Sequence, residues 1–149
     1  MGGCKSKYKT KDNDSKISKI HNISNIENPK NNKHLICDDA FTNRLVLKKY
    51  LIQFGCATDE AENGLDALDK VKENGTYKII WMDIKMPKMD GHECTQILRQ
   101  NMDYNGPIIG LTGYVDNNSI KTCLSLGMNF VVSKPFDSRI IQTYVDKFN

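Results

Sequence analysis

Five polar residues stand at the ends of short apolar runs, and together they hold the functional groups needed for phosphoryl transfer. Three are carboxylates, one is a hydroxyl and one is an ammonium: Asp38, Asp39, Asp83, Thr112 and Lys134. Short apolar runs, such as residues 79–82 before Asp83, are typical of buried strands in a parallel sheet. The carboxyl ends of parallel strands share one edge, where open α/β folds bind ligands. We therefore expect the five side chains to meet at that edge.

The chemistry of such a group follows from its charges. Carboxylates held about 4 Å apart repel by roughly 1 to 4 kcal/mol per pair, and a hard divalent cation such as Mg²⁺ removes that cost. Asp83 can act as a nucleophile that forms an aspartyl-phosphate. Lys134 supplies a positive charge to a phosphate oxygen, and Thr112 supplies a hydroxyl donor. Catalysis of this kind consists mainly of positioning and charge neutralisation.

The elements between these residues alternate. Apolar residues with helical spacing follow each run, at 45–51, 65–71, 97–98, 120–124 and 140–145. Turn signals such as Asn63-Gly64 and Asn74-Gly75 separate them. Alternating strands and helices predict a doubly wound parallel sheet in one domain. We place this domain at residues 34–149 and a basic tail and linker at residues 1–33.

Residues 34–149 resemble a response-regulator receiver domain of the CheY-like superfamily. The motifs that carry the resemblance are Asp38-Asp39, residues 82–91 around Asp83, Thr112-Gly113 and Lys134-Pro135-Phe136. Residues 38–44 are further similar to receivers that are fused to, or served by, hybrid histidine kinases. The resemblance implies a flavodoxin-like α/β fold, with five parallel strands in the order 2-1-3-4-5 and helices on both faces.

The resemblance also implies roles for single residues. Asp83 would accept the phosphoryl group from a histidine kinase or a histidine phosphotransfer protein. Asp39, Asp83 and the backbone carbonyl of Lys85 would bind Mg²⁺, with Asp38 acting through a metal-bound water. A cis peptide bond is implied before Pro135. The downstream protein is not identified, and it stays open whether phosphorylation also drives homodimerisation.

Two features bear on how this chain compares with the family pattern, one at Val131 and one at Lys85 and Tyr114. Receivers often carry an aromatic residue three positions before the lysine, where this chain has Val131 and places Phe130 one residue earlier. Either the switch works without an aromatic side chain, or Phe130 substitutes through a local shift. Lys85 and Tyr114, two positions after Asp83 and Thr112, occupy places that set phosphoryl lifetime in the family. Their bulk predicts slow hydrolysis.

Two other functions remain to be weighed. One is an interaction module that keeps the fold without being phosphorylated, and the intact five-residue site argues against it. The other is a hydrolase that works through an aspartyl-phosphate. Such enzymes use a second acidic residue two places after the nucleophile, where this chain has Lys85. We expect a phospho-acceptor with only self-catalysed phosphorylation and dephosphorylation, and no turnover enzyme.

The basic tail predicts a membrane anchor. Residues 1–33 hold eight lysines against three acidic residues, a charge of +5, while the remainder carries −2 of the total of +3. The first residues fit the N-myristoylation pattern with Gly2 as acceptor, and Cys4 is placed for palmitoylation. One acyl chain binds membranes only marginally, so the lysines or Cys4 must add to it. We expect a cytoplasmic protein held on the cytosolic face of an anionic membrane; the alternative is an ordinary lysine-rich tail.

Other function classes find little support. Five cysteines without a C-x-x-C pair favour a reducing compartment, and no P-loop or metal-spaced Cys/His set is present. No DNA-binding module follows the domain, so we expect no nucleic-acid partner. No apolar run approaches the roughly 20 residues that span a bilayer. His21, His34 and His92 are not expected to carry phosphate, and His34 is expected to precede the first strand.

Overall fold

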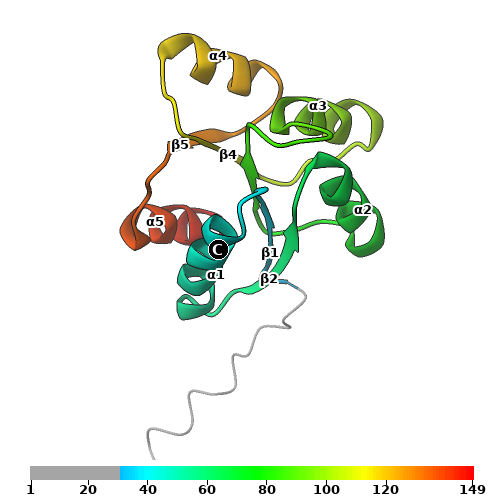
Figure 1. Ribbon diagram of the computed structural model, residues 1–149. Helices are drawn as coiled ribbons and strands as arrows, with labels where there is room; N and C mark the ends of the chain where they lie inside the picture. The colour runs from blue at the N-terminus through cyan, green and yellow to red at the C-terminus, as the bar shows by residue number, and fades with distance from the viewer. Residues whose placement is uncertain (1–30) are drawn as a thin grey trace, which may run out of the picture.

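A computed structural model describes residues 31–149, which form a five-stranded sheet with helices on both faces (Figure 1). The predicted acylation sites Gly2 and Cys4 lie outside the described residues. The strands are β1 (Lys33–Cys37), β2 (Ala57–Ala61), β3 (Ile80–Asp83), β4 (Ile108–Thr112) and β5 (Phe130–Ser133). The helices are α1 (Phe41–Gln53), α2 (Gly64–Asn74), α3 (Gly91–Asn101), α4 (Asn117–Ser125) and α5 (Ser138–Phe148).

All strand pairs are parallel, in the order β2-β1-β3-β4-β5, which confirms the predicted topology. Helices α1 and α5 cover one face of the sheet, and α2, α3 and α4 cover the other (Figure 1). Strands therefore end, and helices begin, at one common edge. Within residues 31–149 no helix is long and apolar enough to span a bilayer.

The two cores follow from the alternation of side chains along each strand. In β1, Leu35 and Cys37 face α2 and α3, whereas Ile36 faces α1 and α5. In β3, Met82 faces α2 and α3 and Trp81 faces α1 and α5, and both are fully buried. A strand covered on both faces needs apolar residues at every position, which explains the continuous apolar runs of the sequence. The four cysteines of the described part are all buried and free.

The helix starts are set by short polar side chains. Asn63, Asp90, Asp116 and Asp137 cap α2, α3, α4 and α5, and each side chain accepts hydrogen bonds from backbone N–H groups of the first turn. Such caps satisfy donors that the helix leaves without partners. Because all these starts lie where the strands end, the caps frame the edge that holds the candidate site.

The first strand corrects one expectation. His34 does not precede β1 but lies within it, fully buried, where its Nδ1 accepts a hydrogen bond of 3.1 Å from the indole N–H of Trp81. Because the imidazole of His34 is polar, the prediction from apolar residues started the strand after it, which was too late. The ring completes the layer of β1 side chains that faces α1 and α5.

Candidate functional site

The three predicted carboxylates gather at the carboxyl edge of the sheet. Oxygen atoms of Asp38, Asp39 and Asp83 all lie within 4.8 Å of one another. Asp38 and Asp39 follow β1, and Asp83 ends the neighbouring strand β3, so the pairing of the two strands brings them together. Asp38 and Asp83 are buried, while Asp39 is exposed. A set of oxygen donors that is open to solvent on one side fits a hard cation such as Mg²⁺.

Lys134 reaches this cluster from β5. Its ammonium lies 2.6 Å from Asp38 Oδ2 and 3.2 Å from Asp83 Oδ1. The residue immediately follows the last residue of β5 and precedes Pro135, and the peptide bond between the two is cis, as predicted. The lysine thus bridges the two buried carboxylates.

Burial and neighbouring charges control protonation in the cluster. Burial raises the pKa of Asp83 above its ordinary value, and the Asp38 carboxylate adds to this, while the Lys134 ammonium opposes it. Burial by itself lowers the pKa of Lys134, but the hydrogen bond to Asp38 and the charge of Asp83 outweigh it, so that the pKa rises. The ammonium is therefore held firmly in its charged form.

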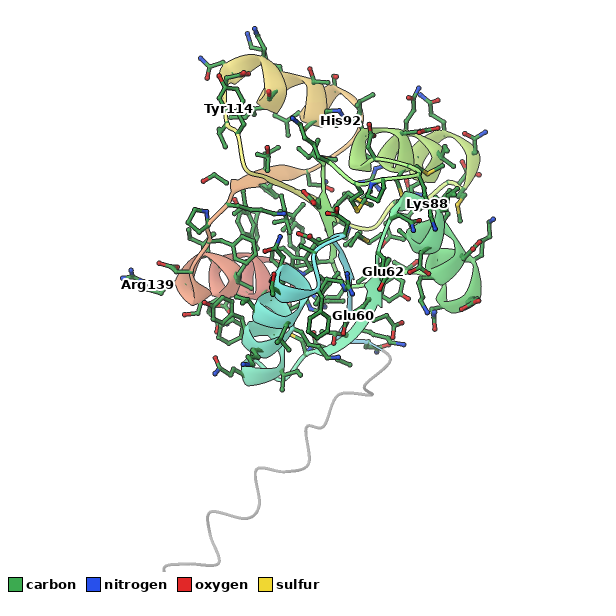
Figure 2. All side chains as sticks on the ribbon, in the orientation of Figure 1. Glu60, Glu62, Lys88, His92, Tyr114 and Arg139 are labelled. Atoms are coloured by element: carbon green, nitrogen blue, oxygen red, sulfur yellow. The ribbon has the colours of Figure 1, made fainter. Side chains whose placement is uncertain are left out.

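Thr112 ends β4 at the same edge, but its hydroxyl is engaged in its own turn. It donates a 2.8 Å hydrogen bond to the carbonyl of Tyr114 and accepts the Tyr114 N–H at 3.1 Å. Tyr114 itself is 70% exposed and lies before the first turn of α4 (Figure 2). In this conformation the hydroxyl is satisfied without a ligand, and donating to another group would break its hydrogen bond to the Tyr114 carbonyl.

The loop after β3 is shaped by close packing. A side chain on Gly91 would collide with the carbonyl of Asp83, and the Gly91 N–H donates to the carbonyl of Ile84 at 2.9 Å. Only glycine lets α3 begin so near the candidate acceptor. Lys85 is exposed within this loop, and the role of its carbonyl as a metal ligand stays a prediction.

Two further residues, Asn43 and Arg44, hold Asp38 in place, and the sequence indicated them only through the family resemblance. The side-chain amide of Asn43 donates to both carboxylate oxygens of Asp38, and the guanidinium of Arg44 donates to the Asp38 carbonyl. Both lie in the first turn of α1. Their polar character at the start of a helix directly after the acidic pair was the available signal.

Phe130, the first residue of β5, faces away from the position that it was considered to replace. Phe130 packs against Tyr144 and Phe148 of α5, with ring centroids 5.2 Å and 6.1 Å apart. Val131, on the other face of the strand, packs against the core beneath α2, α3 and α4. This arrangement favours the alternative in which no aromatic side chain takes part in the switch.

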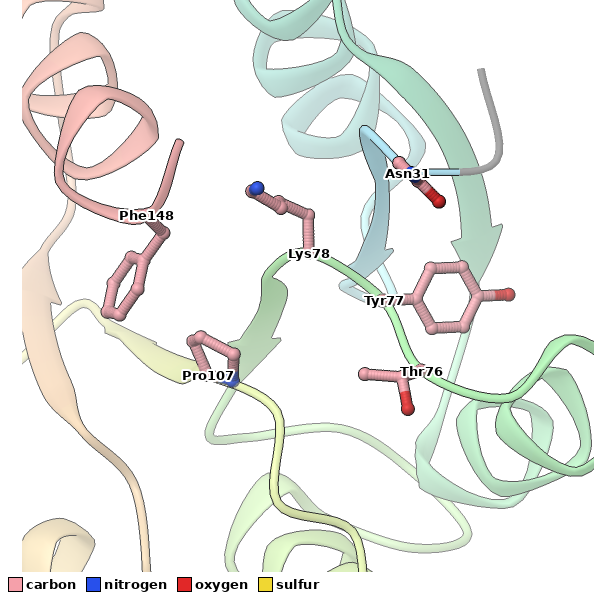
Figure 3. A pocket seen from close by; sticks show the side chains of 6 residues that line it. All are labelled: Asn31, Thr76, Tyr77, Lys78, Pro107 and Phe148. Carbon is pink, nitrogen blue, oxygen red and sulfur yellow. The ribbon is translucent and has the colours of Figure 1, made fainter. Parts of the chain in front are cut away.

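Hollows occur at both edges of the sheet. One of about 340 Å³ adjoins the acidic cluster and is lined by Asn43, Val46, Lys134, Pro135 and Phe136. Another, of about 460 Å³, lies at the opposite edge and is lined by Asn31, Lys78, Pro107 and Phe148 among others (Figure 3). Only the first lies beside the predicted site residues.

Comparison with known proteins identifies relatives. A model of the response regulator receiver domain matches residues 35–146. The osmosensing histidine protein kinase SLN1 of Saccharomyces cerevisiae is 38% identical over 121 residues, which are 78% of this chain and 10% of the kinase. The sensor protein EvgS of Escherichia coli K12 is 39% identical over 115 residues, 77% of this chain and 9% of EvgS. The chain thus spans about a tenth of these relatives.

Solved structures agree with the fold. A two-component response regulator from Clostridium difficile superposes with a TM-score of 0.73 at 28% identity, covering 78% of this chain and 93% of that one. The CheX–CheY–BeF₃–Mg²⁺ complex from Borrelia burgdorferi gives 0.72 at 29% identity, with 78% and 89% covered.

Proposed function

The chain belongs to the response regulator receiver domain family of two-component signalling, and we propose that it accepts a phosphoryl group on Asp83 from a phosphohistidine donor, with Mg²⁺ as cofactor. The observation that carries the proposal is the Lys134 ammonium, which contacts both Asp38 and Asp83 beside Asp39. Three carboxylates and one ammonium at the ends of three strands form a site for a dianionic group bound through a cation.

In the proposed reaction, a carboxylate oxygen of Asp83 attacks the phosphorus of the donor. The new oxygen–phosphorus bond replaces the nitrogen–phosphorus bond, and the imidazole of the donor leaves with the electron pair of the broken bond. Asp39, Asp83 and the Lys85 carbonyl would hold Mg²⁺, with Asp38 acting through a water, and the cation would supply charge neutralisation at the phosphoryl oxygens. Hydrolysis of the product is self-catalysed and slow.

Lys134 and Thr112 serve the phosphorylated state. The ammonium lies close enough to Asp83 to pair with an oxygen of a phosphoryl group attached there. The Thr112 hydroxyl is held by Tyr114, and it becomes a donor to the phosphoryl group when that turn opens. Opening moves the segment that leads into α4, which changes a surface that a downstream protein reads.

We assign the donor a docking surface on α1. Phe41 is 63% exposed, and Leu45 and Val46 are also exposed on the same helix. Val46 lines the hollow of about 340 Å³ together with Pro135 and Phe136, directly beside Lys134. Exposed apolar residues that adjoin a reactive group are typical of a protein-interaction surface. An apolar helix face carrying the phosphohistidine fits this surface.

We also propose that the chain is tethered to a membrane. The support is in the sequence: Gly2 in an N-myristoylation pattern, Cys4 beside it, and a run of lysines suited to anionic lipid. The protein would then be cytoplasmic and peripheral, with Asp83 reacting at the cytosolic face.

Intact-mass analysis tests the acceptor. Purified chain incubated with acetyl phosphate and Mg²⁺ is expected to gain one phosphoryl group, and Asp83→Asn or omission of Mg²⁺ is expected to prevent the gain. Circular dichroism of the variant checks that the fold is intact. Labelling of Asp83→Asn at the rate of the native chain contradicts the assignment of the acceptor. No labelling of a folded native chain by acetyl phosphate or by a phosphohistidine protein favours the interaction-module alternative.

A further inference from the structure

We propose that Asn43 and Arg44 are positioning residues that fix Asp38 for Mg²⁺ binding, a role that rests on the proposed function of the site. Neither side chain touches Asp39 or Asp83 in the contacts that the structure gives for residues 31–149. Both act on Asp38, one on its carboxylate and the other on its backbone.

Asn43 orients the carboxylate. Its Nδ2 donates to Asp38 Oδ1 at 3.2 Å and to Oδ2 at 3.1 Å, and the backbone N–H of Ala40 donates to Oδ1 at 2.8 Å. These donors lie at the N-terminal end of α1 and fix the plane of the Asp38 carboxylate. The buried carboxylate of Asp38 is therefore held in one orientation before any cation binds.

Arg44 fixes the backbone of the same residue. Its Nη1 donates to the carbonyl of Asp38 at 2.8 Å, and the side chain is only 7% exposed. The guanidinium is held in turn by Glu60 of β2 at 3.1 Å and by Glu62, just after that strand, at 3.2 Å. Lys48 holds Glu60 from the next turn of α1 at 2.7 Å. The planar guanidinium therefore ties the loop after β1 to the edge strand β2.

A neutral donor has an advantage over Lys134 in this role. Lys134 also contacts Asp38, at 2.6 Å, but an ammonium repels a cation that binds to the same carboxylates. The amide of Asn43 carries no net charge, so it can hold Asp38 without opposing the cation. Residues that hydrogen-bond to metal-binding groups orient them, and their loss commonly lowers metal affinity by 10- to 100-fold. Asn43 is placed to give Asp38 this support.

The test is an isothermal calorimetric titration in which Mg²⁺ alone is added to the unphosphorylated full chain. Asn43→Ala is expected to raise the dissociation constant for Mg²⁺ about tenfold. Asn43→Gln keeps an amide on a longer stem and is expected to recover part of the affinity. Thr42→Ala, a change at the exposed neighbour of Asn43, is the matched control and is expected to bind as the native chain does.

Arg44→Lys is the second variant, because it keeps the charge but loses the planar fork, and it is expected to weaken Mg²⁺ binding as well. Thermal unfolding without Mg²⁺ restricts the comparison to variants that are folded at the temperature of titration. Native affinity in folded Asn43→Ala overturns the role of Asn43, and native affinity in folded Arg44→Lys overturns that of Arg44. A native chain that binds Mg²⁺ more tightly than both folded variants but is never phosphorylated refutes the proposed function and still supports this inference.

Discussion

Two buried titratable side chains tie stability to pH, and the first is His34. Burial lowers its pKa to about 4, and the nearby Lys78 ammonium acts in the same direction. In the unfolded chain the imidazole titrates near 6.5. Between these values the unfolded state binds a proton that the folded state does not, so stability falls as pH drops from about 6.5 to about 4. The loss amounts to about 3 kcal/mol.

Urea unfolding at a series of pH values measures this effect. His34→Asn does not titrate, and its amide oxygen can still accept the hydrogen bond from Trp81. The variant is expected to lose less stability than the native chain over the same interval. If the free energy of unfolding depends on pH in the same way for the two proteins, His34 is protonated equally easily in the folded and unfolded states.

Asp83 has the opposite sign. Its folded-state pKa is raised, so its ionised form destabilises the folded chain at neutral pH. This cost shrinks as pH falls through the folded-state pKa and is gone below the pKa of the unfolded chain. Without Mg²⁺, Asp83→Asn is therefore expected to be more stable than the native chain at pH 7. Added Mg²⁺ at about 100 times its dissociation constant is expected to stabilise the native chain by about 2.7 kcal/mol. Thermal unfolding with and without Mg²⁺ measures the stability of the variant and the effect of the cation. If Mg²⁺ stabilises Asp83→Asn as much as the native chain, Asp83 is not a ligand.

Among the elements, strands with apolar runs were predictable and β2 was not. Its sequence, Ala57 to Ala61, contains Asp59 and Glu60, which pair with Lys33, Arg44 and Lys48. As an edge strand it has one neighbour, β1, and needs no continuous apolar sequence. Its place in the sheet came from the family resemblance alone.

The same contrast holds for the candidate site. The meeting of Asp38, Asp83 and Lys134 was predictable, because strand ends in a parallel sheet share an edge. The attachment of Arg44 to Glu60 was not, because it depends on how α1 rotates against β2. Sequence periodicity does not fix such a rotation when a helix is apolar on several sides, as α1 is.

Helix α1 gives a prediction of its own. Phe41→Ser combined with Val46→Ser removes two exposed apolar side chains of α1, of which Val46 lines the hollow beside Lys134. The double variant is expected to slow phosphoryl transfer from a histidine phosphotransfer protein at least tenfold. Loss of one or two apolar anchors, at about 1.4 kcal/mol per tenfold, is sufficient for this. Stopped-flow transfer kinetics provide the measurement.

The control for this experiment is Leu124→Ser, an equally apolar and exposed position on α4. It is expected to leave the transfer rate unchanged, and acetyl phosphate is expected to label all three proteins at similar rates. If the double variant takes phosphate from the protein donor at the native rate, the donor docks elsewhere.

For the full chain, we propose that the tail determines where the domain works. Gly2→Ala is expected to move the protein from the membrane pellet to the supernatant when expressed in a eukaryotic cell, because it removes the acceptor of the acyl chain. Cys4→Ser tests whether a second acyl chain is needed, and fractionation with mass analysis of the N-terminal peptide measures both. Unchanged membrane recovery of Gly2→Ala refutes acylation as the anchor.

One hollow at the edge of the sheet opposite Asp83 bears on how such a domain is used in larger proteins. Asn31 and Phe148 line it together, so the chain enters and leaves the domain at neighbouring points (Figure 3). A partner sequence joined at either point, or at both, would extend away from the acidic cluster. Sequence joined at these two points would therefore leave the acidic cluster uncovered, which fits relatives of which this chain matches about a tenth.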